Sequence, residues 1–179
     1  VPTYSRPQCV GPISVKDLKP LEVDLQNFKE ALSVSEATDA FMNAASPGVI
    51  AQFQPNQHYP DHSSYLYALA DAMKVEYEGI AEAGLVIQID SPDLALGRHV
   101  LFKDQSDEEF VTMAELHIEA LNHALQNIPA EQLRLHVCWG NYQGPHHCDI
   151  EMKKILPAVL KAKPMALSFE GANPRHSHE

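Results

Sequence analysis

The segment at residues 85–90, Leu-Val-Ile-Gln-Ile-Asp, constrains the fold of this chain more than any other part of the sequence. It is nearly all apolar, which is typical of a strand that is buried on both faces in a parallel sheet covered by helices. Its carboxylate, Asp90, comes last, at the carboxyl end of the predicted strand. The segment therefore predicts an α/β fold.

Strand-like runs alternate with amphipathic helical stretches along the whole chain. Asp61 can cap a helix with apolar side chains every three or four residues, and Ser106 with Glu109 forms a capping box that opens another. Ser46 followed by Pro47 marks a further helix start. Two more helices are predicted at residues 22–32 and 151–161, and five strands at residues 8–14, 40–45, 85–90, 133–139 and 165–169.

The alternation of strands and helices requires parallel strands joined by right-handed crossovers. An open doubly wound sheet and a part of an eight-stranded (β/α) barrel both satisfy this order. No Gly-rich phosphate loop follows any predicted strand, which weakens the nucleotide-binding version of the first fold. No linker or charge block divides the chain, so we expect a single domain over residues 1–179.

Composition restricts the class of partner. The 179 residues are 45% hydrophobic and 21% charged, as in ordinary soluble globular domains. The formal net charge of -11 repels phosphate backbones and anionic lipids, so we expect a small-molecule substrate, no nucleic acid and no membrane. No run approaches the roughly 20 apolar residues of a membrane helix, and the start lacks a secretion signal, which predicts a cytoplasmic location. The chain has three cysteines, an odd and small number that argues against a disulfide framework.

Candidate functional residues stand where the predicted strands end, because both folds gather their sites beyond the carboxyl ends of strands. His136 and Cys138 are two apart on one strand, so their side chains point to the same face. Glu170 closes the next strand and can supply a third ligand. Nitrogen, sulfur and oxygen donors together suit zinc. Alternatively, the cysteine and the histidine are ordinary core residues.

Two further positions at strand ends are candidates for substrate binding. Asp90 can pair with a substrate ammonium or ligate a metal, or it can simply cap the segment before Pro92. Ser46, which follows the strand over residues 40–45, is expected to bind substrate together with Asp90. The run at residues 146–148, His-His-Cys, also offers ligands, but a solvated loop or a substrate lid is favoured there.

A resemblance to a known family rests on three motifs in chain order at three predicted strand ends: Ile87-Gln88-Ile89-Asp90-x-Pro92, His136-x-Cys138 and Ser168-x-Glu170. With them, nearly the whole chain resembles the carboxyl-terminal catalytic barrel of cobalamin-independent methionine synthase. The resemblance implies a partial (β/α)8 TIM barrel of the methionine synthase/uroporphyrinogen decarboxylase type, with about five parallel strands. It implies zinc bound by His136, Cys138 and Glu170, and the amino group of homocysteine bound by Asp90.

The implied reaction is the zinc-dependent transfer of a methyl group from methyltetrahydrofolate to the thiol of homocysteine. The family's fourth zinc ligand and its proton-donating histidine lie further downstream than this chain reaches. We therefore expect the chain to be a fragment of a catalytic barrel that lacks amino-terminal and carboxyl-terminal strands. Alone it should fold poorly or associate into homo-oligomers.

Departures from the family pattern keep other functions open. Ser91 stands where methionine synthases usually carry an acidic residue, and residues 139–147 differ from their usual continuation. Residues 44–48 and 169–176 also resemble epoxyalkane:coenzyme M transferase, which implies zinc-dependent alkylation of another thiol. A tetrapyrrole-binding barrel similar to uroporphyrinogen decarboxylase, without zinc, and a non-catalytic binding protein are the remaining alternatives.

Overall fold

A four-stranded parallel sheet forms the centre of the computed structural model, which describes residues 7–141 and 144–172. Each strand pairs with the next one along the chain, and each pairing is parallel. This sequential order without reversal is that of part of a (β/α) barrel, whereas a doubly wound sheet reverses its order at a switch point. The strands are β1 (Phe41–Ala45), β2 (Val86–Asp90), β3 (Leu133–Val137) and β4 (Ala166–Phe169).

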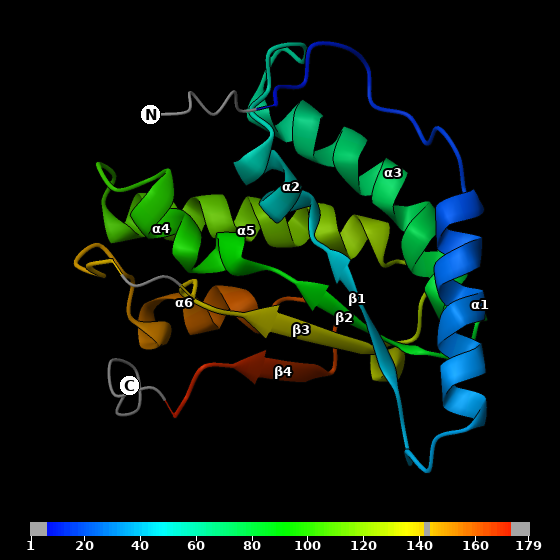
Figure 1. Ribbon diagram of the computed structural model, residues 1–179. Coiled ribbons are helices and arrows are strands. Elements are labelled where there is room, and N and C mark those ends of the chain that lie inside the picture. Colours follow the sequence, from blue (N-terminus) through cyan, green and yellow to red (C-terminus); the bar gives the residue numbers. More distant parts are fainter. Residues whose placement is uncertain (1–6, 142–143, 173–179) are drawn as a thin grey trace.

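Helices pack on one face of this sheet, while α1 lies across its amino-terminal end (Figure 1). The predicted helix starts are confirmed. The Ser46 hydroxyl accepts a hydrogen bond from the Val49 amide, and Ser106 and Glu109 form the reciprocal capping box. The helices are α1 (Lys19–Ser33), α2 (Pro47–Phe53), α3 (His62–Glu82), α4 (Leu96–Val100), α5 (Asp107–Ala124) and α6 (Met152–Val159), with short 3-10 turns at Pro92–Leu94 and Ala130–Gln132.

The strand predicted at residues 8–14 is wrong, so the described part of the sheet has four strands and not five. Only Cys9 forms a bridge, and it pairs with Asn56 in the loop between α2 and α3. Pro7 and Pro12 flank this bridge and carry no amide hydrogen. A segment so interrupted cannot donate a regular ladder of hydrogen bonds to a neighbouring strand.

The two faces of the sheet have different environments. Ile87 and Ile89 of β2 are fully buried against the helical layer, as are the alternate residues of β3. The opposite face is half-buried or exposed, and its side chains pair with one another. The Gln88 amide donates to Asn43 Oδ1 over 2.8 Å, and the Arg134 guanidinium lies 3.8 Å from the centre of the Phe41 ring. In a closed barrel this second face is the interior.

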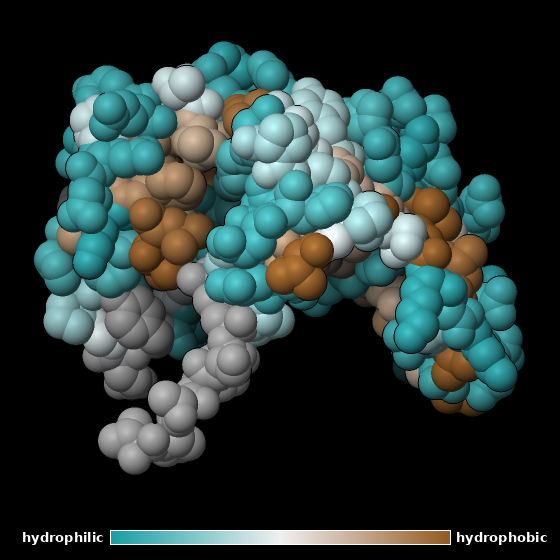
Figure 2. Space-filling model, turned by 90° about the horizontal axis from the view of Figure 1, so that it is seen from above, coloured by the Kyte–Doolittle hydropathy of each residue, from teal (hydrophilic) through white to brown (hydrophobic). Residues whose placement is uncertain are grey.

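No helix in the described ranges is long and apolar enough to cross a membrane. Apolar side chains reach the surface seen from above in separate patches among hydrophilic ones (Figure 2). The most exposed of the large apolar residues, Val10, Val34, Leu160 and Met165, are scattered along the chain.

Candidate functional site

The predicted site residues come together at the carboxyl ends of β2, β3 and β4, at the edge of the sheet to which the arrows in Figure 1 point. Asp90 pairs in register with His136, and His136 pairs in register with Ser168. Cys138 follows the end of β3, and Glu170 follows the end of β4. Parallel pairing therefore brings residues from three distant parts of the sequence to one edge.

His136, Cys138 and Glu170 line a single pocket of about 400 Å³. The pocket also includes Gly140 and Phe169, from the segments that directly follow Cys138 and precede Glu170. Its nitrogen, sulfur and oxygen donors have the chemistry that zinc accepts. Within residues 7–141 and 144–172, however, no group of three histidine, cysteine or acidic side chains is already arranged to hold a metal ion. The three donor types are ones that zinc accepts, but the three side chains do not converge on one point in the described structure.

Asp90 lies beside His136, one of the residues that line this pocket. Its Oδ1 atom lies 3.9 Å from His136 Nε2, and the two side chains are 49% and 29% exposed. Burial raises the pKa of Asp90 above its ordinary value, His136 opposes this, and the charge of Asp93 adds to it. Asp90 is thus accessible to a substrate, and its carboxylate lies beyond hydrogen-bond distance from the imidazole.

The Cys138 thiol lies among negative charges. Burial raises its pKa, a hydrogen bond from the Gly140 amide opposes the rise, and the charges of Asp90, Glu170 and Asp93 add to it. Within the described part of the chain, the charges that act on this sulfur are all negative. A cation in the pocket would therefore be needed to favour the thiolate.

Backbone hydrogen bonds fix the loops that carry the site. The Ser46 amide donates to the Asp90 carbonyl over 3.0 Å, and the Leu96 amide donates to the Cys138 carbonyl over 3.3 Å. Gly140 has φ +83°, and a Cβ there would lie 2.8 Å from Leu96 Cδ1. Glycine is required at this position for both its conformation and its lack of a side chain.

Ser46, predicted to bind substrate, is 2% exposed in this structure. Its hydroxyl donates to Asp93 Oδ1 over 2.7 Å and accepts the Val49 amide over 3.0 Å. The hydroxyl proton and one lone pair are therefore engaged within the protein. Substrate binding by Ser46 stays a prediction.

Sequence reasoning missed a buried polar cluster beside the site. Asp93 Oδ2 lies 2.8 Å from His117 Nδ1, and His117 Nε2 lies 2.9 Å from His62 Nε2. The available signal was a histidine inside an apolar stripe, since His117 falls between the buried residues Ala114 and Ile118 of α5. Its partners could not be read from the sequence, because they belong to other elements.

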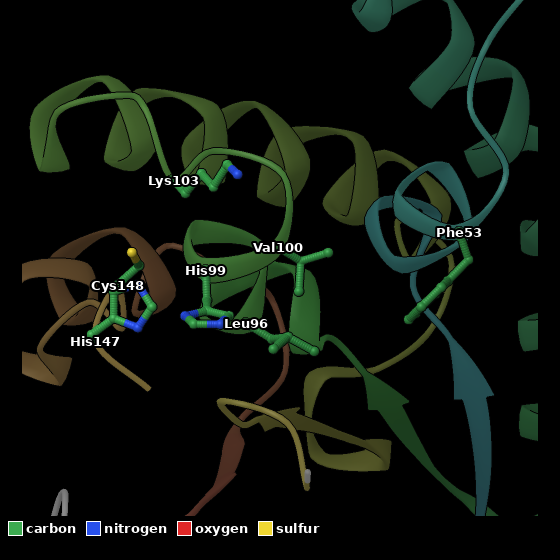
Figure 3. Close-up of a pocket in the computed structure, with 7 residues that line it drawn as sticks. All are labelled: Phe53, Leu96, His99, Val100, Lys103, His147 and Cys148. Carbon is green, nitrogen blue, oxygen red and sulfur yellow. The ribbon is translucent and has the colours of Figure 1, made fainter. Parts of the chain in front are cut away.

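A second pocket, of about 520 Å³, opens beside α4 at the same end of the sheet (Figure 3). It is lined by Phe53 from the end of α2, residues of α4, Lys103, His147 and Cys148. The loop over residues 146–148 is anchored here rather than solvated throughout. His146 is 5% exposed, its Nδ1 atom lies 2.8 Å from Asp149 Oδ2, and its ring stacks on that of His99 at 5.9 Å.

Comparison with known proteins finds relatives over most of this chain. No family model matches the chain. A protein named methionine synthase from Saccharolobus solfataricus is 30% identical over 169 residues, which cover 92% of this chain and 46% of that protein. Methionine synthase from Sulfurisphaera tokodaii is 29% identical over 140 residues, or 78% of this chain and 36% of that protein. The chain thus spans less than half the length of these relatives. Along most of its length the chain is thus similar to proteins named methionine synthase, which supports a methionine synthase-like family.

Proposed function

We propose that this chain carries part of the active site of a zinc-dependent, cobalamin-independent enzyme that transfers a methyl group from methyltetrahydrofolate to the thiol of homocysteine. The observation that carries the proposal is the common pocket of His136, Cys138 and Glu170 at the carboxyl edge of the sheet. The relatives named methionine synthase support methyl transfer in methionine synthesis.

His136, Cys138 and Glu170 would hold the zinc ion, and a further ligand would come from outside these residues. Bound zinc would keep the substrate thiol as a thiolate at neutral pH, well below its ordinary pKa of about 8.5. Asp90 would bind the ammonium group of homocysteine, because its carboxylate is half-exposed beside the pocket residue His136.

The test is metal analysis of the full-length protein with a matched pair of cysteine variants. Cys138→Ser should lose tightly bound zinc and thiol alkylation, because it removes the only sulfur among the described residues that line the pocket. Cys148→Ser should keep both, because Cys148 lines the other pocket. Equal zinc content in the wild type and Cys138→Ser would contradict the assignment, and a zinc-free wild type would favour the uroporphyrinogen decarboxylase-like alternative.

A thiol other than homocysteine is the second candidate acceptor. Ser91 is buried and carries no charge, so Asp90 lacks the acidic neighbour usual in methionine synthases. Lys103 lines the adjacent pocket of Figure 3 and makes no ion pair or hydrogen bond with another described residue, so its ammonium group is available to an anionic group of the substrate. Parallel assays with homocysteine and a sulfonate thiol would separate the two acceptors.

A further inference from the structure

Four polar side chains form one hydrogen-bonded chain behind the candidate site. Ser46 donates to one carboxylate oxygen of Asp93 over 2.7 Å, and the other oxygen lies 2.8 Å from His117 Nδ1. The chain continues from His117 Nε2 to His62 Nε2 over 2.9 Å. Its members come from the cap of α2, the turn after β2, the middle of α5 and the first residue of α3. We call these four residues the buried relay.

Only one end of the buried relay meets water. The side chains of Asp93 and His117 are 2% and 4% exposed, and Ser46 is 2% exposed. His62 is half-buried at the start of α3. A buried carboxylate is costly unless hydrogen bonds satisfy it, and here both of its oxygens have a partner.

Gly48 provides the space in which the relay closes. A Cβ at this position would lie 2.0 Å from Asp93 Oδ2 and 2.5 Å from His117 Nδ1. Any side chain would push the carboxylate and the imidazole apart. The close approach of α2 to these two groups therefore depends on the absence of a side chain at residue 48.

Proton positions along the relay are linked. When a carboxylate is ionised it only accepts hydrogen bonds, so the proton of this contact is then carried by Nδ1 of His117. The gap between the two Nε2 atoms holds a single proton, which belongs to either His117 or His62. The pKa of His62 is lowered to about 4, mainly by burial and then by the neighbouring His117, while the charges of Asp61 and Asp93 oppose the change. His62 is thus neutral at physiological pH.

The relay is connected to the candidate site through the ends of β1 and β2. The Ser46 amide donates to the carbonyl of Asp90, and Asp93 follows Asp90 by three residues in the same turn. We propose that Asp93 and His117 are positioning residues that hold Ser46 and the end of β2, and through them Asp90 beside the candidate site, with His62 as the solvent end of the same chain. The link to acceptor binding rests on the proposed function.

The relay is tested by titrating His62 in the full-length protein with histidine ¹⁵N NMR. In Asp93→Asn the pKa of His62 should fall below that of the wild type, because a charge that raises it is lost. In His117→Gln it should rise, because a neighbour that lowers it is lost. Opposite shifts in the pKa of His62 distinguish a coupled chain from general damage to the fold. Such damage would move this pKa toward its ordinary value in both variants.

His123→Gln is the matched control, because His123 pairs with Asp71 on the surface and is not part of the relay. It should leave the pKa of His62 unchanged. If Asp93→Asn fails to fold, Ser46→Ala serves instead and should shift the His117 Nδ1 resonance. An unchanged pKa of His62 in both Asp93→Asn and His117→Gln would overturn the relay. A shift of this pKa in the same direction in both variants would also overturn it.

The positioning role has its own readout in kinetics. Asp93→Asn and His117→Gln should raise KM for the thiol acceptor about tenfold, the effect of losing one well-placed hydrogen bond, with kcat within about threefold of the wild type. A loss of kcat in both variants without any change in KM would overturn the positioning role. A wild-type protein without thiol alkylation would refute the proposed function and leave the NMR result on the relay intact.

Discussion

The carboxylate of Asp90 lies 3.9 Å from the imidazole of His136, measured from Oδ1 to Nε2, across a register pair that joins β2 to β3. The two residues are 46 positions apart, yet parallel pairing places them on the same face at the same edge. One of them is a predicted zinc ligand and the other a predicted substrate ligand. A change at Asp90 should therefore affect substrate recognition while leaving the donor atoms of His136 in place.

Asp90→Asn tests this separation of roles. The amide keeps the shape of the side chain but removes its charge, so binding of an amino thiol should weaken by about 10- to 100-fold, as expected for loss of a charge-assisted hydrogen bond. A sulfonate thiol, which has no ammonium, should be barely affected. The measurement is KM for both acceptors in the full-length enzyme, with zinc content as the control. Equal losses for both acceptors would contradict recognition of the ammonium by Asp90.

Gly140→Ala tests the support of the loop after Cys138. Gly84 is a matched control, because it also has a left-handed φ, +82°, but a Cβ there would meet nothing within 4 Å. Gly84→Ala should cost about 1 kcal/mol for conformation alone. Gly140→Ala should cost a further 1–3 kcal/mol, roughly the effect of overpacking against Leu96. Urea unfolding of both variants measures the difference, and equal costs would show that the loop can move away from Leu96.

Ser106→Ala tests the capping box of α5, one of the helices that cover the sheet. The substitution removes the acceptor for the Glu109 amide and should lower the free energy of unfolding by about 1 kcal/mol. Ser106→Thr keeps a hydroxyl at the same place and should recover most of this loss. Thermal unfolding of the two variants provides the comparison. A Ser106→Ala variant that unfolds at the same temperature as the wild type would indicate that packing alone holds this end of α5.

Acid should weaken the fold through His62. The folded protein keeps this imidazole neutral down to a pKa of about 4, whereas the unfolded chain takes up a proton near 6.5. The unfolded state binds more protons between these values, so stability falls as pH falls through this window. Because His62 is partly exposed, the loss should be about 1–2 kcal/mol. His62→Gln should flatten the pH dependence of urea unfolding between pH 6.5 and 4, and an unchanged slope would contradict the shift.

Local patterns predicted much of the secondary structure. The apolar run ending at Asp90 is β2, and the caps at Ser46, Asp61 and Ser106 open the expected helices. These features depend on neighbours within a few residues, which a sequence displays directly. The failure at residues 8–14 has the same origin. A short apolar run between prolines resembles a strand locally, but strand formation depends on a partner elsewhere in the chain.

The amino-acid sequence by itself determined which residues end the strands, and so which side chains reach the carboxyl edge where His136, Cys138 and Glu170 line one pocket. Only the tertiary structure decided that Asp93 meets His117, 24 residues away, and that His117 meets His62, 55 residues away. The two kinds of feature differ in the distance along the chain over which they are set. Alternation and capping are set by adjacent residues, whereas contacts within the buried relay depend on how α2, α3 and α5 pack against one another.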